Sequence, residues 1–384
     1  MGLTKLVFTS TLSFLFLAAY SAPEPQGLKQ TIKGAYYPSW AQNMPPSNIN
    51  TDYFTHIFYA FLVPNNTTFT FDITPDLDKS LKTFTAALRD KNPPVGALFS
   101  IGGGGVEPSL FSRMASSQNN RAAFIQSSIK VARKYKFAGF DLDYEFPQNT
   151  YDMANLGHLL KEWRAAVKAE ASQTKLQPLL ITAAVYYSAG PFLSGPPRSY
   201  PAAQIQESLD WVNMMDYDYH GSWDANATGE HAQLYDRTGG KLSTSYGVDS
   251  WIRAGVSPNK MVMGFPLYGK TYTLKNKTMI GIGAPAKGVG PGVDGIMTYS
   301  EVVDFYMKLR KKRKNKVEVF FDARSVSMYA VAGKVWIGFD GFQSVFAKVQ
   351  YAKDKGLRGY FFWAVNGDSN WTLSRTASET WKIA

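Results

Sequence analysis

The stretch Phe137-Ala-Gly-Phe-Asp-Leu-Asp-Tyr-Glu-Phe-Pro147 alternates apolar and acidic side chains. Successive side chains of a β-strand point to opposite faces, so Asp141, Asp143 and Glu145 would share one face and the large apolar residues the other. In a barrel, the apolar face can pack against surrounding helices while the acids point inward. We expect Pro147 to end the strand, which leaves Glu145 nearest the C-terminal rim, where the active sites of such barrels form.

Seven further β-rich apolar runs surround this stretch and alternate with helical patterns. The eight expected strands are Ile32–Tyr37, His56–Phe61, Val95–Ile101, Gly139–Phe146, Leu179–Tyr186, Trp211–Tyr217, Met261–Phe265 and Gly359–Val365. The clearest amphipathic helix between them runs from Met153 to Val167. Strands that alternate with helices pair in parallel, so the pattern predicts an α/β fold, a TIM-like (β/α)8 barrel. An open doubly wound sheet is less consistent, because Tyr37-Pro-Ser-Trp40 stands where that fold carries a glycine-rich phosphate loop.

One interval is too long for a simple strand–helix unit. Between Gly269 and Gly338 lie a Gly/Pro-rich loop, a helix and three strand-like segments. We interpret residues 269–338 as a small α+β domain inserted between strands seven and eight, where it builds up one wall of the cleft. The barrel itself would comprise residues 22–268 and 339–384.

The first 21 residues have the pattern of a signal peptide. Lys5 precedes a short apolar run, and the small residues Ala19 and Ser21 suit cleavage before Ala22. A membrane anchor is the alternative, but the run falls short of the roughly 20 apolar residues that a span needs. The pattern therefore predicts a secreted, extracellular protein, with the vacuole as another destination. N-glycosylation sequons stand at Asn65, Asn66, Asn226, Asn276 and Asn370.

The formal net charge is +11, and much of the excess lies in the basic run Lys308–Lys316. A nuclear signal, nucleic-acid binding or attachment to an acidic surface such as wall pectin are the functional interpretations. A solvated helix end is favoured over them, given the signal peptide. We therefore expect no nucleic-acid or membrane partner and a monomeric barrel. The chain has no cysteine, and its four histidines show no metal-ligand spacing, so we expect neither a metal nor a cofactor.

Three acids on one face of a strand repel one another, which raises the pKa of at least one of them. A general acid that works near neutral pH must stay protonated, and crowding by Asp143 would help to keep Glu145 so. The alternatives are an exposed acidic face and a calcium site. An exposed face does not explain the aromatic residues opposite, and a calcium loop would need glycine and flexible oxygen ligands.

The acidic stretch resembles the D-G-x-D-x-D-x-E signature of glycoside hydrolase family 18. Three more segments are similar to motifs of that family: Leu98-Phe-Ser-Ile-Gly-Gly103, Met215-Asp-Tyr-Asp-Tyr-His-Gly221 and Gly264-Phe-Pro-Leu-Tyr-Gly269. Trp363 stands where the family keeps a tryptophan on its eighth strand. The lack of cysteine and the closing Gly367-Asp-Ser-Asn-Trp-Thr-Leu-Ser374 look like plant class V chitinases. The resemblance covers nearly all of the chain after the leader.

The resemblance implies a retaining, substrate-assisted chitinase without a protein nucleophile. Glu145 would be the acid and then the base, Asp143 would orient the substrate acetamide, Tyr217 would donate a hydrogen bond to it, and Asp141 would tune Asp143. Chitin or chitooligosaccharides would be the substrate. The residues implied to surround the cleaved sugar are Tyr36, Phe61, Gly103, Met215, Asp218, Tyr268 and Trp363. Tyr36, Phe61 and Met215 are equally compatible with barrel core.

Several positions depart from the family pattern. Ala138 replaces the first acid of the signature, and Gly104 replaces an aromatic residue that some relatives use as a sugar platform. In a regular strand Tyr217 and Asp218 would face opposite ways, so both reach the site only if a twist or bulge intervenes. Three alternatives to a chitinase remain open: a chitinase-like lectin that binds without cleaving, a hydrolase specialised for lipochitooligosaccharide signals, and, least favoured, a proteinaceous inhibitor of other glycosidases on the same scaffold.

Overall fold

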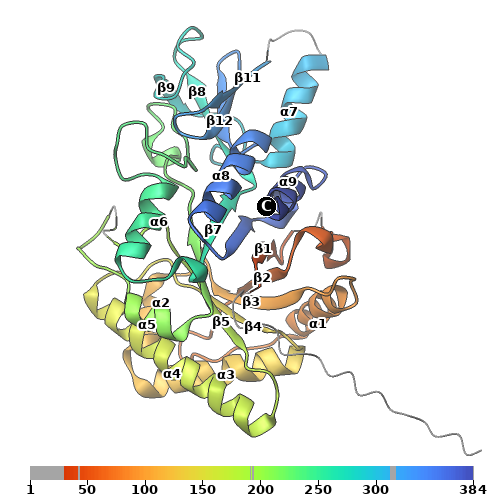
Figure 1. The fold of residues 1–384 in the computed structure, drawn as a ribbon, viewed down its shortest axis with the longest axis vertical. Helices are drawn as coiled ribbons and strands as arrows, with labels where there is room; N and C mark the ends of the chain where they lie inside the picture. The colour runs from red at the N-terminus through yellow and green to blue at the C-terminus, as the bar shows by residue number, and fades with distance from the viewer. Residues whose placement is uncertain (1–29, 42–43, 191, 193, 312–316, 384) are drawn as a thin grey trace, which may run out of the picture. The chain divides into compact units, whose positions relative to one another are not determined.

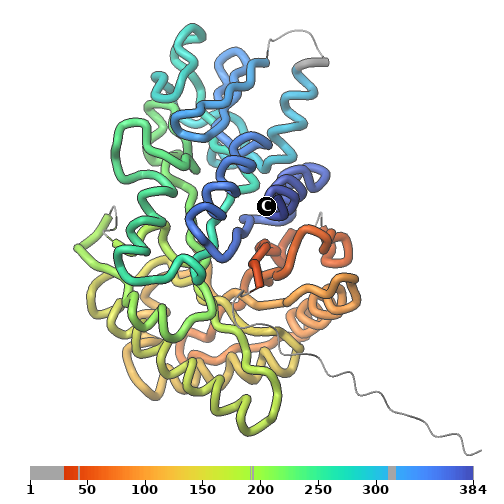
Figure 2. Tube along the Cα trace, viewed as in Figure 1, coloured from red at the N-terminus to blue at the C-terminus, as the bar shows by residue number. Residues whose placement is uncertain are grey.

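The computed structural model describes residues 30–41, 44–190, 192, 194–311 and 317–383, so the expected signal peptide at residues 1–21 lies outside the described part. Eight parallel strands close into a barrel in the order β1-β14-β7-β6-β5-β4-β3-β2, and helices surround it (Figure 1, Figure 2). The expected TIM-like barrel is therefore confirmed. Its strands are β1 (Ile32–Pro38), β2 (His56–Leu62), β3 (Gly96–Gly102), β4 (Gly139–Asp143), β5 (Leu180–Tyr186), β6 (Trp211–Met215), β7 (Met261–Pro266) and β14 (Gly359–Trp363).

Amphipathic helices cover the outside of the barrel. They are α1 (Pro75–Arg89), α2 (Pro108–Ser116), α3 (Gln118–Tyr135), α4 (Thr150–Thr174), α5 (Ala202–Ser208), α6 (Thr244–Arg253), α8 (Phe342–Asp354) and α9 (Thr372–Lys382). On α4, Trp163 stacks on Phe140 of β4 with ring centroids 4.6 Å apart. The apolar face of β4 thus packs against helices, as its alternation predicts. No helix in the described residues is long and apolar enough to cross a membrane.

A second sheet and helix α7 (Tyr299–Lys311) lie between β7 and β14 in the chain, which confirms the expected α+β insertion. The strands of this sheet are β8 (Tyr268–Leu274), β9 (Ala286–Val289), β10 (Ile296–Thr298), β11 (Val317–Asp322), β12 (Ser327–Ala332) and β13 (Val335–Phe339). The sheet appears in Figure 1 above the barrel, in the cyan-to-blue part of the chain. Its first strand follows β7 directly, so the insertion begins at the rim where the barrel strands end.

Three barrel strands end earlier than their sequence patterns predict, and one of them, β14, stops at Trp363 rather than Val365. β4 stops at Asp143 rather than Phe146, and β6 stops at Met215 rather than Tyr217. Alternation of apolar and polar residues continues beyond the last strand pairing, and this continuation made the expected strands too long. As a result Glu145, Tyr217 and Asp218 all lie in loops just past the strand ends, where backbone direction is no longer set by a neighbouring strand.

Candidate active site

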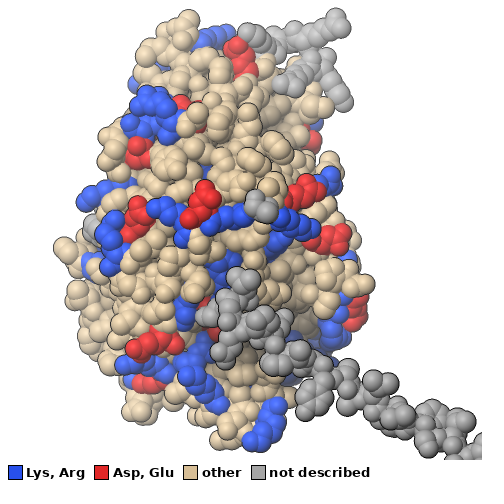
Figure 3. Space-filling model, in the orientation of Figure 1, with Lys and Arg blue, Asp and Glu red and all other residues tan. Residues whose placement is uncertain are grey.

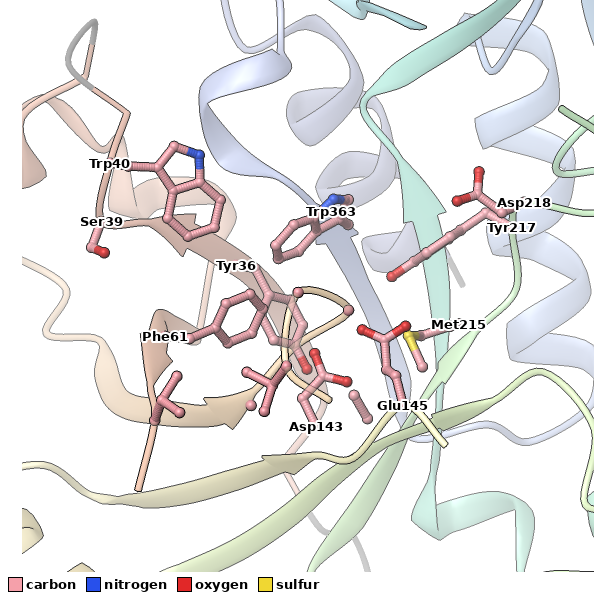
Figure 4. Close-up of a pocket in the computed structure, with 16 residues that line it drawn as sticks. Tyr36, Ser39, Trp40, Phe61, Asp143, Glu145, Met215, Tyr217, Asp218 and Trp363 are labelled. Carbon is pink, nitrogen blue, oxygen red and sulfur yellow. The ribbon is translucent and has the colours of Figure 1, made fainter. Parts of the chain in front are cut away.

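A cavity of about 640 Å³ opens at the C-terminal ends of the barrel strands (Figure 4). Residues from seven of the eight barrel strands or from the loops that follow them converge on it. Its lining is Tyr36, Ser39, Trp40, Phe61, Val63, Gly102, Gly104, Gly105, Val106, Asp143, Glu145, Ala184, Met215, Tyr217, Asp218 and Trp363. The cavity is therefore at the position where the sequence predicts a site.

Asp141 lies beneath the cavity and is fully buried. Its register on β4 places it level with Ser100 of β3 and Thr182 of β5. Both hydroxyls donate to its carboxylate, at 2.8 and 2.7 Å, and Tyr36 donates a third hydrogen bond at 2.8 Å. Burial raises the pKa of Asp141, and these hydrogen bonds oppose that rise. Asp141 therefore supports Asp143, the next inward-facing residue of β4, and does not itself line the cavity.

Asp143, the last residue of β4, points into the cavity from its floor (Figure 4). Burial raises its pKa well above the usual value, and the neighbouring charges of Glu145 and Asp141 raise it further. Asp143 and Glu145 are hydrogen-bonded to each other. Among the described residues, Oδ1 of Asp143 has no hydrogen-bond partner. The pair therefore holds a proton near neutral pH and offers one free carboxyl oxygen.

Glu145 lies two residues beyond the end of β4, and its carboxyl group faces the open part of the cavity (Figure 4). Burial raises the pKa of Glu145 to about 7; the charge of Asp218 acts in the same direction, whereas hydrogen bonds with Asp143 and the Gly104 backbone oppose it. A side chain at Gly104 would begin 3.3 Å from Oε1 of Glu145. Glycine at this position therefore leaves room beside the carboxyl group.

Tyr217 and Asp218 both line the cavity although they are adjacent in sequence. They can do so because β6 has already ended and Asp218 adopts a left-handed backbone conformation with φ of 61°. This local turn is the departure from regular strand geometry that lets both Tyr217 and Asp218 reach the cavity. Burial and the charges of Asp143 and Glu145 raise the pKa of Tyr217 well above its usual value. Its hydroxyl therefore remains a hydrogen-bond donor.

Asp218 is held by residues of the inserted sheet and a neighbouring loop. Tyr268 donates to its Oδ1 at 2.8 Å, and Nζ of Lys270 lies 3.1 Å from the same atom. Desolvation in the cleft would raise the pKa of Asp218, but His231, Lys270 and Tyr268 together lower it to about 2. Asp218 therefore carries a negative charge beside Glu145, and that charge favours the protonated form of Glu145.

Aromatic rings form one wall of the cavity. Phe61 and Trp363 stack with centroids 5.6 Å apart, and Tyr36 meets Trp363 edge-on at 5.5 Å. Trp40 extends this wall toward solvent and is 61% exposed (Figure 4). Flat apolar surfaces beside carboxyl groups suit the apolar faces and polar edges of sugar rings.

The structure places most of the predicted residues together, with three exceptions. Asp141 lies below the cavity, and Tyr268 lies behind Asp218. Gly103 is not among the lining residues, and a Cβ there would meet the Phe61 ring at 2.5 Å, so glycine permits close packing. For Tyr36, Phe61 and Met215, where the sequence allowed either core or site, the side chains reach the cavity.

Sequence reasoning missed several residues that build the site. Ser39, Val63, Gly105, Val106 and Ala184 also line the cavity, and they carry no chemical signature in the sequence. Asn213 is hydrogen-bonded to both Tyr36 and Asp141 inside the barrel. A polar residue at an inward position of the apolar strand Trp211–Met215 was the available signal for it.

Comparison with known proteins identifies the class to which this fold and site belong. The sequence model of Glycosyl hydrolases family 18 matches residues 33–368. The chain therefore belongs to glycosyl hydrolase family 18.

Within that family the chain is similar to plant class V chitinases. It is 42% identical over 391 residues to a class V chitinase of Medicago truncatula, covering 99% of this chain and 100% of that protein. It is 45% identical over 358 residues to Nod factor hydrolase protein 1 of the same species, covering 91% and 90%. A solved structure, a class V chitinase from Nicotiana tobaccum in complex with NAG4, matches with a TM-score of 0.86 and 40% identity, over 92% of this chain and 99% of that one.

Proposed function

We propose that this protein is a chitinase that hydrolyses β-1,4 linkages of N-acetylglucosamine oligomers and polymers by a retaining, substrate-assisted mechanism. The observation that carries the mechanism is the hydrogen bond between Asp143 and Glu145. Two carboxyl groups that act from opposite faces of a sugar stand about 5 Å or more apart. A hydrogen-bonded pair is too close for that arrangement, which supports a nucleophile supplied by the substrate itself.

The reaction then proceeds in two steps. Glu145 donates its proton to the glycosidic oxygen as the bond from that oxygen to the anomeric carbon breaks, and the 2-acetamido oxygen of the substrate bonds to that carbon to give an oxazolinium ion. Water next attacks the anomeric carbon, Glu145 takes a proton from it, and the acetamido oxygen is released. A pKa of about 7 suits a group that serves first as acid and then as base.

The neighbouring residues orient the acetamide and balance its charge. Asp143 accepts the acetamide N–H through its free oxygen and stabilises the positive oxazolinium ion. The Tyr217 hydroxyl donates to the acetamide oxygen. The ring of Trp363 forms the apolar floor under the sugar that is cleaved, beside Tyr36 and Phe61.

The chemistry explains the substrate class, because a sugar without an N-acetyl group would supply no nucleophile. Two observations outside the chain support chitin-type substrates: the similar Medicago truncatula protein is a class V chitinase, and the similar Nicotiana tobaccum structure holds NAG4. A lipochitooligosaccharide substrate is the second candidate, favoured by the 45% identity to Nod factor hydrolase protein 1.

We further propose that the protein is secreted as a monomeric, N-glycosylated enzyme. This rests on the leader pattern of residues 1–21 and on the exposure of four of its sequon asparagines, Asn66, Asn226, Asn276 and Asn370. The amide of Asn65 is instead hydrogen-bonded to Asp72, and its Oδ1 accepts from the backbone of Thr67. Of the two overlapping sequons, the one at Asn66 is therefore the better acceptor.

The test is hydrolysis of the N-acetylglucosamine hexamer by the mature protein beside its Glu145→Gln variant. Cleavage by the parent and its loss in the variant support the proposed function. Binding of the hexamer without cleavage by either protein would replace it with the lectin. Faster cleavage of a lipochitooligosaccharide than of the unacylated oligomer of equal length would favour the second candidate.

A further inference from the structure

Lysine and arginine gather at the N-terminal end of the barrel, which is the end opposite the cavity. Helices finish here and strands begin here, and five of the connections between them carry exposed or half-buried cations. These residues are Arg89, Lys91, Lys136, Lys175, Arg253, Lys355 and Arg358. Figure 3 shows Lys and Arg in a row across the molecule at the level of α6, α8 and α9, with fewer Asp and Glu among them.

The loops at the cavity end have the opposite character. They carry the acids Glu107, Glu145, Asp218, Asp224 and Asp368. The insertion, residues 269–338, also carries much of the positive excess of the chain, so the N-terminal end of the barrel is one of two positive regions.

Helix dipoles account for part of this pattern, because cations near the C-terminus of a helix are stabilised. They do not account for Lys33 and Arg358, which stand at the start of β1 and just before β14. Burial and the nearby charge of Lys382 lower the pKa of Lys33 to about 8. Burial is the larger of the two causes, and Nζ of Lys33 donates to the backbone oxygen and the hydroxyl of Ser378, so Lys33 is not offered to a ligand.

A groove of about 400 Å³ lies at the same end, between the C-terminal ends of α1 and α3. Its exposed apolar surface is formed by Pro94 and Leu176, and Arg89 and Lys136 stand among its lining residues. The nearest acid to Arg89 is Asp90 at 3.5 Å, and both of these side chains are more than half exposed, so their pairing is weak. A third cation of the groove, Arg133, is held by Glu170 at 2.6 Å.

We propose that this groove and the surrounding cations bind an acidic polysaccharide of the polyuronate type. The carboxylates of such a chain pair with Arg89 and Lys136, and the apolar faces of its sugar rings lie against the apolar surface of the groove. Because the groove and the catalytic cavity lie at opposite ends of the barrel, the enzyme can be held on an acidic matrix with its cleft open. This proposal does not depend on the proposed function of the cavity.

Two other polyanions fit the surface less well. Proteins that bind single-stranded nucleic acid stack bases on exposed aromatic rings, but the exposed tryptophans Trp40 and Trp223 lie in loops that follow strand ends on the cavity side. Membrane binding needs a contiguous apolar patch, whereas the exposed Leu176, Ile252 and Ile383 belong to separate elements of this end.

The test uses the mature chain and polygalacturonate as the probe, with binding measured by calorimetry between 25 and roughly 200 mM salt, a range over which such binding weakens steeply. The double variant Arg89→Glu/Lys136→Glu removes two cations from the groove. We expect its affinity at low salt to fall by at least about tenfold and the slope of log affinity against log salt to fall by roughly two. The matched control is Lys277→Glu/Lys334→Glu, which makes the same change of net charge at two exposed residues of the insertion.

Each outcome decides the proposal. Loss of binding in the groove variant but not in the control, with unchanged thermal unfolding, supports it. Equal loss in both variants would show attraction by net charge without a site and would overturn it. No binding by the parent at low salt would overturn it as well, as would equal or tighter binding of double-stranded DNA or of phosphatidylserine vesicles.

Discussion

The ionised carboxylate of Glu145 is costly to the folded protein, and this cost can be measured. Burial raises the pKa of Glu145 from its ordinary value of 4.5 to about 7. Each pKa unit corresponds to about 1.4 kcal/mol, so the folded state loses roughly 3 kcal/mol once Glu145 is fully ionised. The folded state binds this proton more tightly than the unfolded chain does. The loss is therefore absent well below pH 4.5, grows as the pH rises past that value, and is complete above about pH 7.

The substitution Glu145→Gln replaces the carboxyl group with a neutral group of the same shape. We expect it to raise the free energy of unfolding by roughly 3 kcal/mol at pH 8 and to leave it nearly unchanged at pH 4, while it abolishes hydrolysis. Urea unfolding of parent and variant at both pH values gives the two differences directly.

The control is Glu107→Gln, at an exposed residue just before α2, which should change stability little at either pH. Equal stabilisation by Glu145→Gln at pH 4 and pH 8 would contradict the reasoning, because an effect of packing does not depend on whether Glu145 is protonated. No stabilisation at pH 8 would mean that the folded protein accommodates the charge, and Glu145 would then not be kept protonated by burial.

Three further outcomes are expected. The rate of hexamer hydrolysis should fall as the pH rises above about 7, because Glu145 then loses the proton that it must donate; a pH–rate profile that stays flat to pH 9 would rule this out. Tyr217→Phe should lower kcat about 100-fold or more with little change in Tm, since it removes one donor to the reacting acetamide; an unchanged kcat in steady-state assays would remove Tyr217 from the mechanism. Lys348→Met should destabilise the fold by about 3–5 kcal/mol in urea unfolding, because it leaves Asp340, whose Oδ1 lies 2.6 Å from Nζ, buried and unpaired. Adding Asp340→Leu should recover much of that loss, and a double variant no more stable than Lys348→Met would contradict the pairing argument.

The local sequence was sufficient to predict an element wherever its apolar and polar residues repeat with the period of a strand or a helix. Alternation of acids and aromatics predicted a strand with Asp141 and Asp143 on its inner face, and Phe140 does pack outward on Trp163. It overestimated the length of that strand, because alternation does not record where the hydrogen bonds to β3 and β5 stop. Tyr217 and Asp218 show the same limit, since their shared access to the cavity depends on a left-handed turn that the sequence does not announce.

By itself, then, the sequence determined the barrel, the insertion and the order of the catalytic motifs, because period-two and helical patterns act over a few neighbouring residues. Only the tertiary structure determined which residues distant in the sequence are neighbours in space. Asp141 receives hydrogen bonds from Ser100, Thr182 and Tyr36, which are scattered over more than a hundred positions of the chain. The charge of Asp218 and the pKa of Glu145 likewise depend on how deeply each group is buried and on which residues lie next to it in the fold, such as Lys270 beside Asp218. A local sequence pattern does not contain this information.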